Sequence, residues 1–150
     1  MKYYFEDKQK QDKLLGILES WIGTPYRHRA GVKGMGCDCV HLPIGVLTEM
    51  GLMKVRKKDV PHYAPDYHMH KTRSMLVDSI AKHLSAEEIT DGSFMNGDIL
   101  CFSFGKTAAH AGFWFNDYLY EAVDRIGVIK THFPNSQWRE KLQHTYRILI

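Results

Sequence analysis

Residues 98–123 read DILCFSFGKTAAHAGFWFNDYLYEAV, and this stretch decides the fold. Three runs in it, DILCFSF, HAGFWF and YLYEAV, are rich in β-branched, aromatic and other apolar residues, which is typical of strands. Asn116 and Asp117 alone separate the second run from the third, a spacing typical of a tight hairpin. Two further runs follow, GVIKT (127–131) and HTYRILI (144–150). The second half of the chain is therefore predicted to be an antiparallel meander of about five strands.

The first half of the chain carries helical periodicity instead. Apolar residues recur at helical spacing over 7–22, after Cys39 and over 72–84. Because proline is tolerated only in the first turn of a helix, Pro43 predicts that the second helix begins close to Cys39. Residues 85–88, Ser-Ala-Glu-Glu, resemble a capping box and predict one further short helical turn. The expected fold class is α+β, with N-terminal helices packed on one face of a C-terminal sheet.

Cys39 lies in GCDCVHL (36–42), where a glycine-rich loop is predicted to become the second helix. Backbone N–H groups and the helix dipole at such a place favour a negative charge. They lower the pKa of a thiol, and the thiolate is the nucleophilic form. The same N–H groups can hold the oxyanion that forms when a carbonyl is attacked. Cys37 and Cys101 are interpreted as buried structural thiols.

A cysteine nucleophile needs a base within hydrogen-bond reach, and His110 opens the second strand of the predicted hairpin. The two-residue turn places Glu121 on the neighbouring strand, one diagonal step from His110 and on the same face. A carboxylate there can orient the imidazole through its second nitrogen. His132 and Asn116 are the alternatives if the strand register slips.

These residues belong to a longer pattern. GTPYRHRAGVKGMGCDCVHL (23–42), followed by NGDILCF (96–102) and HAGFWF, resembles the NlpC-type cell-wall cysteine peptidases, a papain-like family. The nearest match is the branch found in phage tails and gene-transfer agents. The resemblance implies a papain-like fold and cleavage of peptidoglycan stem peptides at the D-γ-glutamyl–diaminopimelate bond through an acyl-enzyme, with no metal or other cofactor. Cys39 would be the nucleophile and His110 the base.

The resemblance also suggests a substrate site. It implies that Tyr26 lines the cleft and that Asp38 recognises the free amine of the substrate. Read from the sequence alone, Tyr26 has ordinary packing as its alternative role, and Asp38 has helix capping. The implied partners are a stem peptide and phage tail proteins.

The chain departs from the family pattern at three positions. Val40 and His41 stand where the family usually has Ser-Gly or a single Gly after the nucleophile, so a large side chain enters the predicted substrate site at His41. Glu121 stands where the family often has His, Asn or Gln. A papain-like acyltransferase or thioesterase and an inactive cell-wall-binding module therefore remain alternatives.

Two other interpretations compete with parts of this hypothesis. A zinc site could use Cys37-x-Cys39-x-His41 together with His68-x-His70, although structural zinc sites usually separate their cysteines by two to four residues. The stretch HYAPDYHMH (62–70) is either a wall of the substrate cleft or an ordinary surface loop.

Composition excludes several classes of protein. The length of 150 residues predicts a single domain over 1–150. Twenty basic residues against seventeen acidic ones give a mixed surface, which argues against nucleic acid as a partner. The sequence contains no apolar run of membrane-spanning length. The charged N-terminal stretch has no apolar signal region, so we expect cytoplasmic synthesis without a signal peptide, followed by incorporation into a phage or gene-transfer particle.

Overall fold

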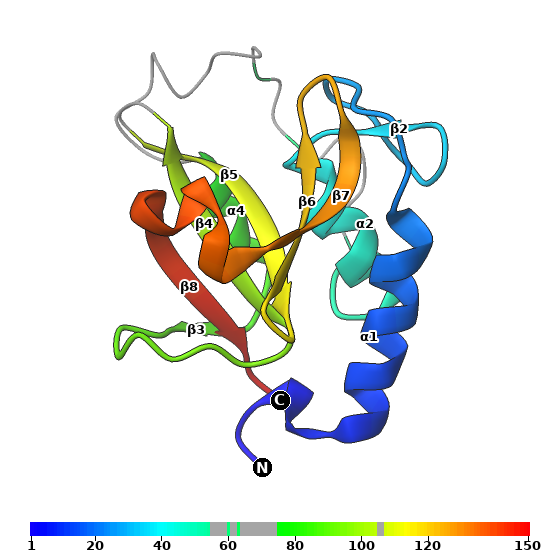
Figure 1. Ribbon diagram of the computed structural model, residues 1–150. Coiled ribbons are helices and arrows are strands. Elements are labelled where there is room, and N and C mark those ends of the chain that lie inside the picture. The colour runs from blue at the N-terminus through cyan, green and yellow to red at the C-terminus, as the bar shows by residue number, and fades with distance from the viewer. Residues whose placement is uncertain (55–59, 61–62, 64–74, 105–106) are drawn as a thin grey trace.

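A computed structural model of the chain describes residues 1–54, 60, 63, 75–104 and 107–150. Its centre is a six-stranded sheet in the order β3-β8-β4-β5-β6-β7 (Figure 1). The strands are β3 (Ala86–Glu88), β4 (Asp98–Phe104), β5 (Thr107–Phe115), β6 (Tyr118–Val123), β7 (Gly127–His132) and β8 (Leu142–Ile148). All neighbours in this sheet pair antiparallel. The predicted α+β fold is confirmed, and β4 to β7 form the predicted meander. The last strand departs from it, because β8 pairs with β4 and not with β7.

The hairpin between β5 and β6 has the predicted register. Phe115 pairs with Tyr118, and Gly112 pairs with Glu121. Asn116 and Asp117 have φ angles of 47° and 69°. Two successive left-handed residues are what a two-residue turn requires if it is to follow the twist of its strands, and Asn and Asp tolerate this conformation.

The predicted helical turn at 85–88 is wrong. Residues 86–88 form β3, an edge strand in which Ala86 pairs with Ile148 and Glu88 with Tyr146. The capping-box pattern is local, whereas the partner strand lies about sixty residues away in the sequence. Pairing with β8 satisfies the backbone groups that a helical turn would otherwise have used.

The described ranges also hold three α-helices, a small hairpin and, before the first helix, the 3-10 turn η1 (Tyr4–Glu6). The helices and the hairpin strands are α1 (Lys8–Trp21), α2 (His41–Glu49), α4 (Met75–His83), β1 (Gly31–Val32) and β2 (Gly36–Cys37). Asp7 caps α1, because its carboxylate accepts the N–H groups of Gln9 and Lys10. As predicted from Pro43, α2 begins close to Cys39. None of the described helices is long and apolar enough to cross a membrane.

Both faces of the sheet are covered. The main core joins α1 and α2 to the sheet, and it includes Leu14, Leu18, Trp21, Val46, Ile99, Cys101, Ala111 and Phe113. A second apolar cluster holds Leu100, Phe102, Leu119, Phe133 and Trp138. The last two residues come from the 3-10 turns η3 (Phe133–Asn135) and η4 (Gln137–Lys141). Since the side chains of a strand alternate between faces, β4 and β5 serve both clusters.

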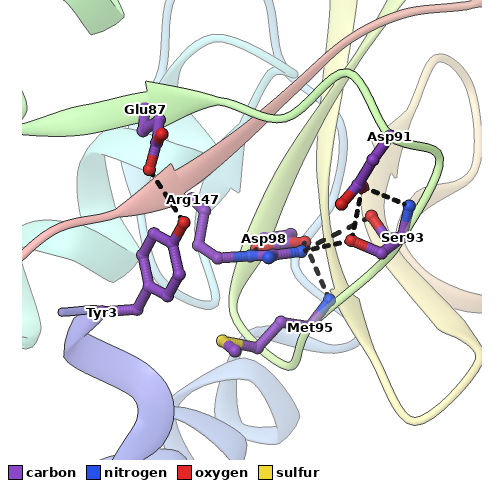
Figure 2. Close-up of polar contacts among 7 residues, drawn as sticks. All are labelled: Tyr3, Glu87, Asp91, Ser93, Met95, Asp98 and Arg147. Carbon is purple, nitrogen blue, oxygen red and sulfur yellow. Dashed lines mark hydrogen bonds and ion pairs between the residues drawn. The ribbon is translucent and has the colours of Figure 1, made fainter. Parts of the chain in front are cut away.

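A buried ion pair fastens the C-terminal strand to the start of β4 (Figure 2). Arg147 donates from Nε and Nη2 to the two carboxylate oxygens of Asp98, both at 2.9 Å. The Met95 N–H also donates to Asp98, at 2.8 Å. Beside this pair, the Tyr3 hydroxyl donates to Glu87 at 2.8 Å, which ties the N-terminal segment to β3.

Candidate active site

His110 and Glu121 form a buried pair on β5 and β6. His110 Nε2 lies 2.8 Å from Glu121 Oε1, and the two residues are 6% and 1% exposed. The predicted partner of the histidine is thus Glu121. The two alternatives lie elsewhere: His132 Nδ1 contacts Asn135, and Asn116 bonds Asn96.

The contact with Glu121 bears on which nitrogen of the His110 ring carries the hydrogen. An ionised carboxylate only accepts hydrogen bonds. Against an ionised Glu121, a neutral His110 would carry its hydrogen on Nε2. Nδ1 is then the ring atom with a lone pair, which is the form a general base needs.

The pair lies where its two strands separate. The register joins β5 to β6 only from Gly112 to the hairpin turn, although β5 begins at Thr107. In Figure 1 the ends of β5 and β6 farthest from that turn diverge. The helix α2 packs against β5. His110 therefore lies on the part of β5 that has no β6 partner. The same strand, β5, contacts α2, the helix that follows Cys39.

Cys39 lies in the turn between β2 and α2. The residue is partly exposed. Burial, and then the negative charge of Asp38, raise the pKa of the Cys39 thiol to about 12, although a hydrogen bond with Tyr26 lowers it in part. The thiol is therefore protonated at neutral pH.

The prediction that the helix start lowers the pKa of Cys39 is wrong for this state of the protein. The helix dipole contributes only about 0.3–1 kcal/mol near an exposed terminus, whereas burial of a thiolate costs more. Burial also raises the pKa of Tyr26, so its hydroxyl keeps its proton beside the sulfur.

Asp38 caps the start of α2. Its Oδ1 accepts the N–H groups of Val40 and His41 at 3.2 and 2.9 Å, and its Oδ2 accepts the Arg29 N–H at 2.7 Å. Burial alone would raise the pKa of this carboxyl, but hydrogen bonds from His41, Tyr63 and Arg29 lower it. The capping alternative is thus confirmed, while amine recognition stays a prediction.

Capping by Asp38 removes two of the N–H groups at the helix start from the predicted oxyanion site. The N–H groups of Val40 and His41 both donate to the Asp38 carboxylate. They are occupied in this structure and do not face an empty anion site. This follows from a carboxylate placed just before the first turn of the helix, where it competes with any other acceptor.

His41 and Tyr63 complete a buried network with Asp38. His41 Nδ1 lies 2.9 Å from Asp38 Oδ1 and 2.9 Å from the Tyr63 hydroxyl, and that hydroxyl donates to Asp38 Oδ2. Sequence reasoning misses Tyr63 as a single residue, although it belongs to the stretch 62–70, which is one candidate wall of the cleft. Most of that stretch lies outside the described residues.

A groove of about 690 Å³ runs beside α2. Its walls are Trp21, residues 28–33, His41, Ile44, Gly45, Thr48, Glu49 and Val60. Gly31 approaches His41 so closely that a β-carbon on this glycine would lie 3.1 Å from the His41 ring. His41 thus lines a groove, which agrees with its predicted place in the substrate site. Substrate binding by His41 stays a prediction.

The zinc alternative gains no support from the described ranges. No group of three or more His, Cys, Asp or Glu side chains in them is placed to hold a metal. His68 and His70 lie outside the described residues. Cys37 is buried beside the turn that holds Cys39, and burial raises the pKa of its thiol to about 12.

Alkylation of Cys39 by iodoacetamide is expected to accelerate about tenfold per pH unit between about pH 7 and pH 10 without reaching a plateau. The reason is that only the thiolate reacts and the pKa of Cys39 lies near 12. Mass spectrometry of the labelled peptide gives the rate for this cysteine alone. In urea the same cysteine should behave as an ordinary thiol and level off above about pH 8.5. A folded-state plateau below neutral pH would contradict the prediction.

Replacing Glu121 by glutamine is expected to lower kcat about 100-fold, with little change in KM, for any reaction in which His110 acts as the base. The amide keeps the size of the side chain but offers no negative charge to an imidazolium at His110. Glu88→Gln is the matched control, because Glu88 also contacts a histidine, His144, at 2.6 Å, on the outer edge of the sheet. Equal kcat values for the two variants would exclude an orienting role for Glu121.

Known proteins resemble this chain in structure and not in sequence. No protein-family model matches it, and no curated protein matches it. A lipoprotein-like protein of the NLP/P60 family from Staphylococcus aureus matches with a TM-score of 0.64 and 19% identity, over 96% of this chain and 43% of its own length. The NlpC/p60 domain of the peptidoglycan hydrolase SagA matches with a TM-score of 0.56 and 14% identity, over 90% and 96%.

A third solved structure agrees with these two. A hypothetical invasion protein of Mycobacterium tuberculosis matches with a TM-score of 0.61 and 17% identity, over 95% of this chain and 63% of its own length. The chain thus spans less than two thirds of the first and third matching proteins. The papain-like fold of the NlpC/P60 proteins is confirmed for this chain, and the phage-tail branch stays a prediction.

Proposed function

We propose that this chain is a cysteine hydrolase that cleaves an amide bond in peptidoglycan stem peptides. One observation carries the proposal: a buried histidine–carboxylate pair lies where β5 and β6 separate, on a strand that packs against the helix following Cys39. Burial of both partners is costly unless they pair, and such pairs are concentrated at functional sites.

The proposed reaction begins from a thiol and a neutral imidazole. As the sulfur bonds to the substrate carbonyl carbon, the thiol proton moves to His110 Nδ1, and Glu121 stabilises the imidazolium through Nε2. The carbon–nitrogen bond then breaks, and the imidazolium protonates the departing amine. The products of this half-reaction are the free amine and a thioester on Cys39.

Water completes the reaction. His110 takes a proton from water as its oxygen attacks the thioester, and the proton returns to the sulfur as the carboxylic acid leaves. Since Asp38 occupies the N–H groups of Val40 and His41, we assign the oxyanion contact to the Tyr26 hydroxyl, which is hydrogen-bonded to the sulfur. A preorganised donor at that point stabilises the charge that develops during attack.

The substrate class rests on resemblance. SagA is a peptidoglycan hydrolase, and this chain shares the fold of its NlpC/p60 domain. We propose the D-γ-glutamyl–diaminopimelate bond as the bond that is cleaved, and a phage or gene-transfer particle as the setting. Proteomic detection of the chain in purified particles would support the setting, and its restriction to the particle-free fraction would contradict it.

Incubation with purified peptidoglycan and with soluble stem peptides tests the proposed activity. We expect a new free amine and a new carboxylic acid in equal amounts, identified by mass spectrometry. Transfer of the acyl group to an added amine would instead identify an acyltransferase. Binding to the wall without any new amine would favour the binding module, an alternative that the protonated Cys39 thiol keeps open.

A further inference from the structure

Trp138 lies on the ring of His110. The two ring centroids are 4.4 Å apart, and their planes differ by 15°, which is a stacked arrangement. Trp138 belongs to η4, about thirty residues after the histidine, and nothing in its local sequence marks it as part of a site. It is 9% exposed and belongs to the second apolar cluster.

The position of the indole is fixed from several sides. Its backbone N–H donates to the Ser136 hydroxyl at 3.0 Å, and Ser136 is the N-cap of η4. Its ring lies 5.4 Å from the ring of Phe102. Phe102 pairs with His110 across β4 and β5, and its ring lies 5.8 Å from the imidazole. The imidazole is thus enclosed by two aromatic rings while its Nε2 contacts Glu121.

We propose that Trp138 is a positioning residue for His110: its indole covers the His110–Glu121 hydrogen bond and holds the imidazole with Nδ1 as the basic atom. This inference deepens the proposed function and rests on it for its catalytic meaning. The stacking of the two rings is a property of the folded chain and does not depend on any activity.

Two physical effects support this role. A stacked indole resists rotation of the imidazole, because rotation would break a ring contact worth more than its buried area alone. The π face of the indole also attracts a cation, so the stack favours the imidazolium that forms during attack by the thiol. Exclusion of water strengthens the contact with Glu121, because the hydrogen bond then lies in a medium of low dielectric constant.

The experiment replaces Trp138 by phenylalanine, leucine or alanine in the full chain and follows the His110 ring by NMR. Trp138→Phe keeps an aromatic face, Trp138→Leu keeps apolar volume without one, and Trp138→Ala removes both. Phe133→Ala is the matched control, since Phe133 lies in the same cluster, is 3% exposed and contacts Phe94 and Phe102.

The main readout is exchange of the His110 Nε2 hydrogen with water, together with the ¹⁵N shifts that report which ring nitrogen is protonated. We expect slow exchange in the native chain, Trp138→Phe and Phe133→Ala. Exchange should be about tenfold faster in Trp138→Leu and Trp138→Ala, with a mixture of ring tautomers. Native exchange in a folded Trp138→Leu protein would overturn the proposal, even if Trp138→Ala fails to fold.

Kinetics supply the second readout. We expect kcat to fall about tenfold in Trp138→Leu with KM nearly unchanged, and to recover in Trp138→Phe. The NMR measurement needs no turnover, so it tests the covering role even if the chain cleaves no stem peptide. An equal loss of kcat in Trp138→Leu and Trp138→Phe would contradict the aromatic part of the proposal.

Discussion

Replacing Cys39 by alanine is expected to lower kcat/KM for stem-peptide cleavage by at least about 1,000-fold. In the proposed reaction the Cys39 sulfur forms the acyl-enzyme, and no other group accepts the acyl group. Release of free amine, followed by mass spectrometry, measures the loss. The acylated peptide carrying Cys39 should also be trapped from the native protein at low pH and be missing from the variant.

Cys101→Ala is the matched control for that experiment. Cys101 is fully buried in the main core, and burial raises the pKa of its thiol. Its loss should cost stability through a small cavity and leave kcat close to native. Activity retained by Cys39→Ala and lost by Cys101→Ala would show that Cys39 is not the nucleophile. Activity retained by both would point to a water nucleophile activated by His110.

The fold can be predicted where the signal is local. The hairpin follows from Asn116-Asp117 and from the alternation on either side, and its register then places Glu121 beside Gly112. The strand β3 cannot be found in this way, since three residues carry no period and the partner β8 decides their conformation. The turns η3 and η4, which cover the second face, escape prediction for the same reason.

In the candidate site, too, the features that follow from local sequence can be predicted and those that depend on distant residues cannot. The contact between His110 and Glu121 follows from strand register, so it is predictable. The pKa of Cys39 is not, because it depends on how deeply the sulfur is enclosed and on a charge at Asp38. Tyr63 and Trp138 reach the site from distant parts of the chain, and only the folded arrangement brings them there.

Replacing Arg147 by methionine is expected to destabilise the fold by about 3–5 kcal/mol. The change leaves the carboxylate of Asp98, which is 1% exposed, without its arginine partner, while the Met95 N–H still donates to it (Figure 2). Burial raises the pKa of Asp98 even with the arginine present, although the pairing also raises the pKa of Arg147. The free-energy cost of removing the Asp98 carboxylate from water is therefore larger than the stabilisation that the ion pair gives this carboxylate. Chemical denaturation at neutral pH measures the loss.

The pH dependence of the stability loss in Arg147→Met shows whether the loss comes from the unpaired charge of Asp98 or from a packing defect. Since the folded-state pKa of Asp98 is raised, the folded protein binds more protons than the unfolded chain at mildly acidic pH, and stability falls as pH rises through that range. Without Arg147 this range extends upward, so Arg147→Met should lose less stability near pH 5 than near pH 8. Asp98→Asn in the same background should restore part of the loss, and Lys8→Met, which breaks an exposed ion pair with Asp12, should cost less than about 1 kcal/mol. A loss independent of pH, or no larger than that of Lys8→Met, would mean that the ion pair does not hold β8 to β4.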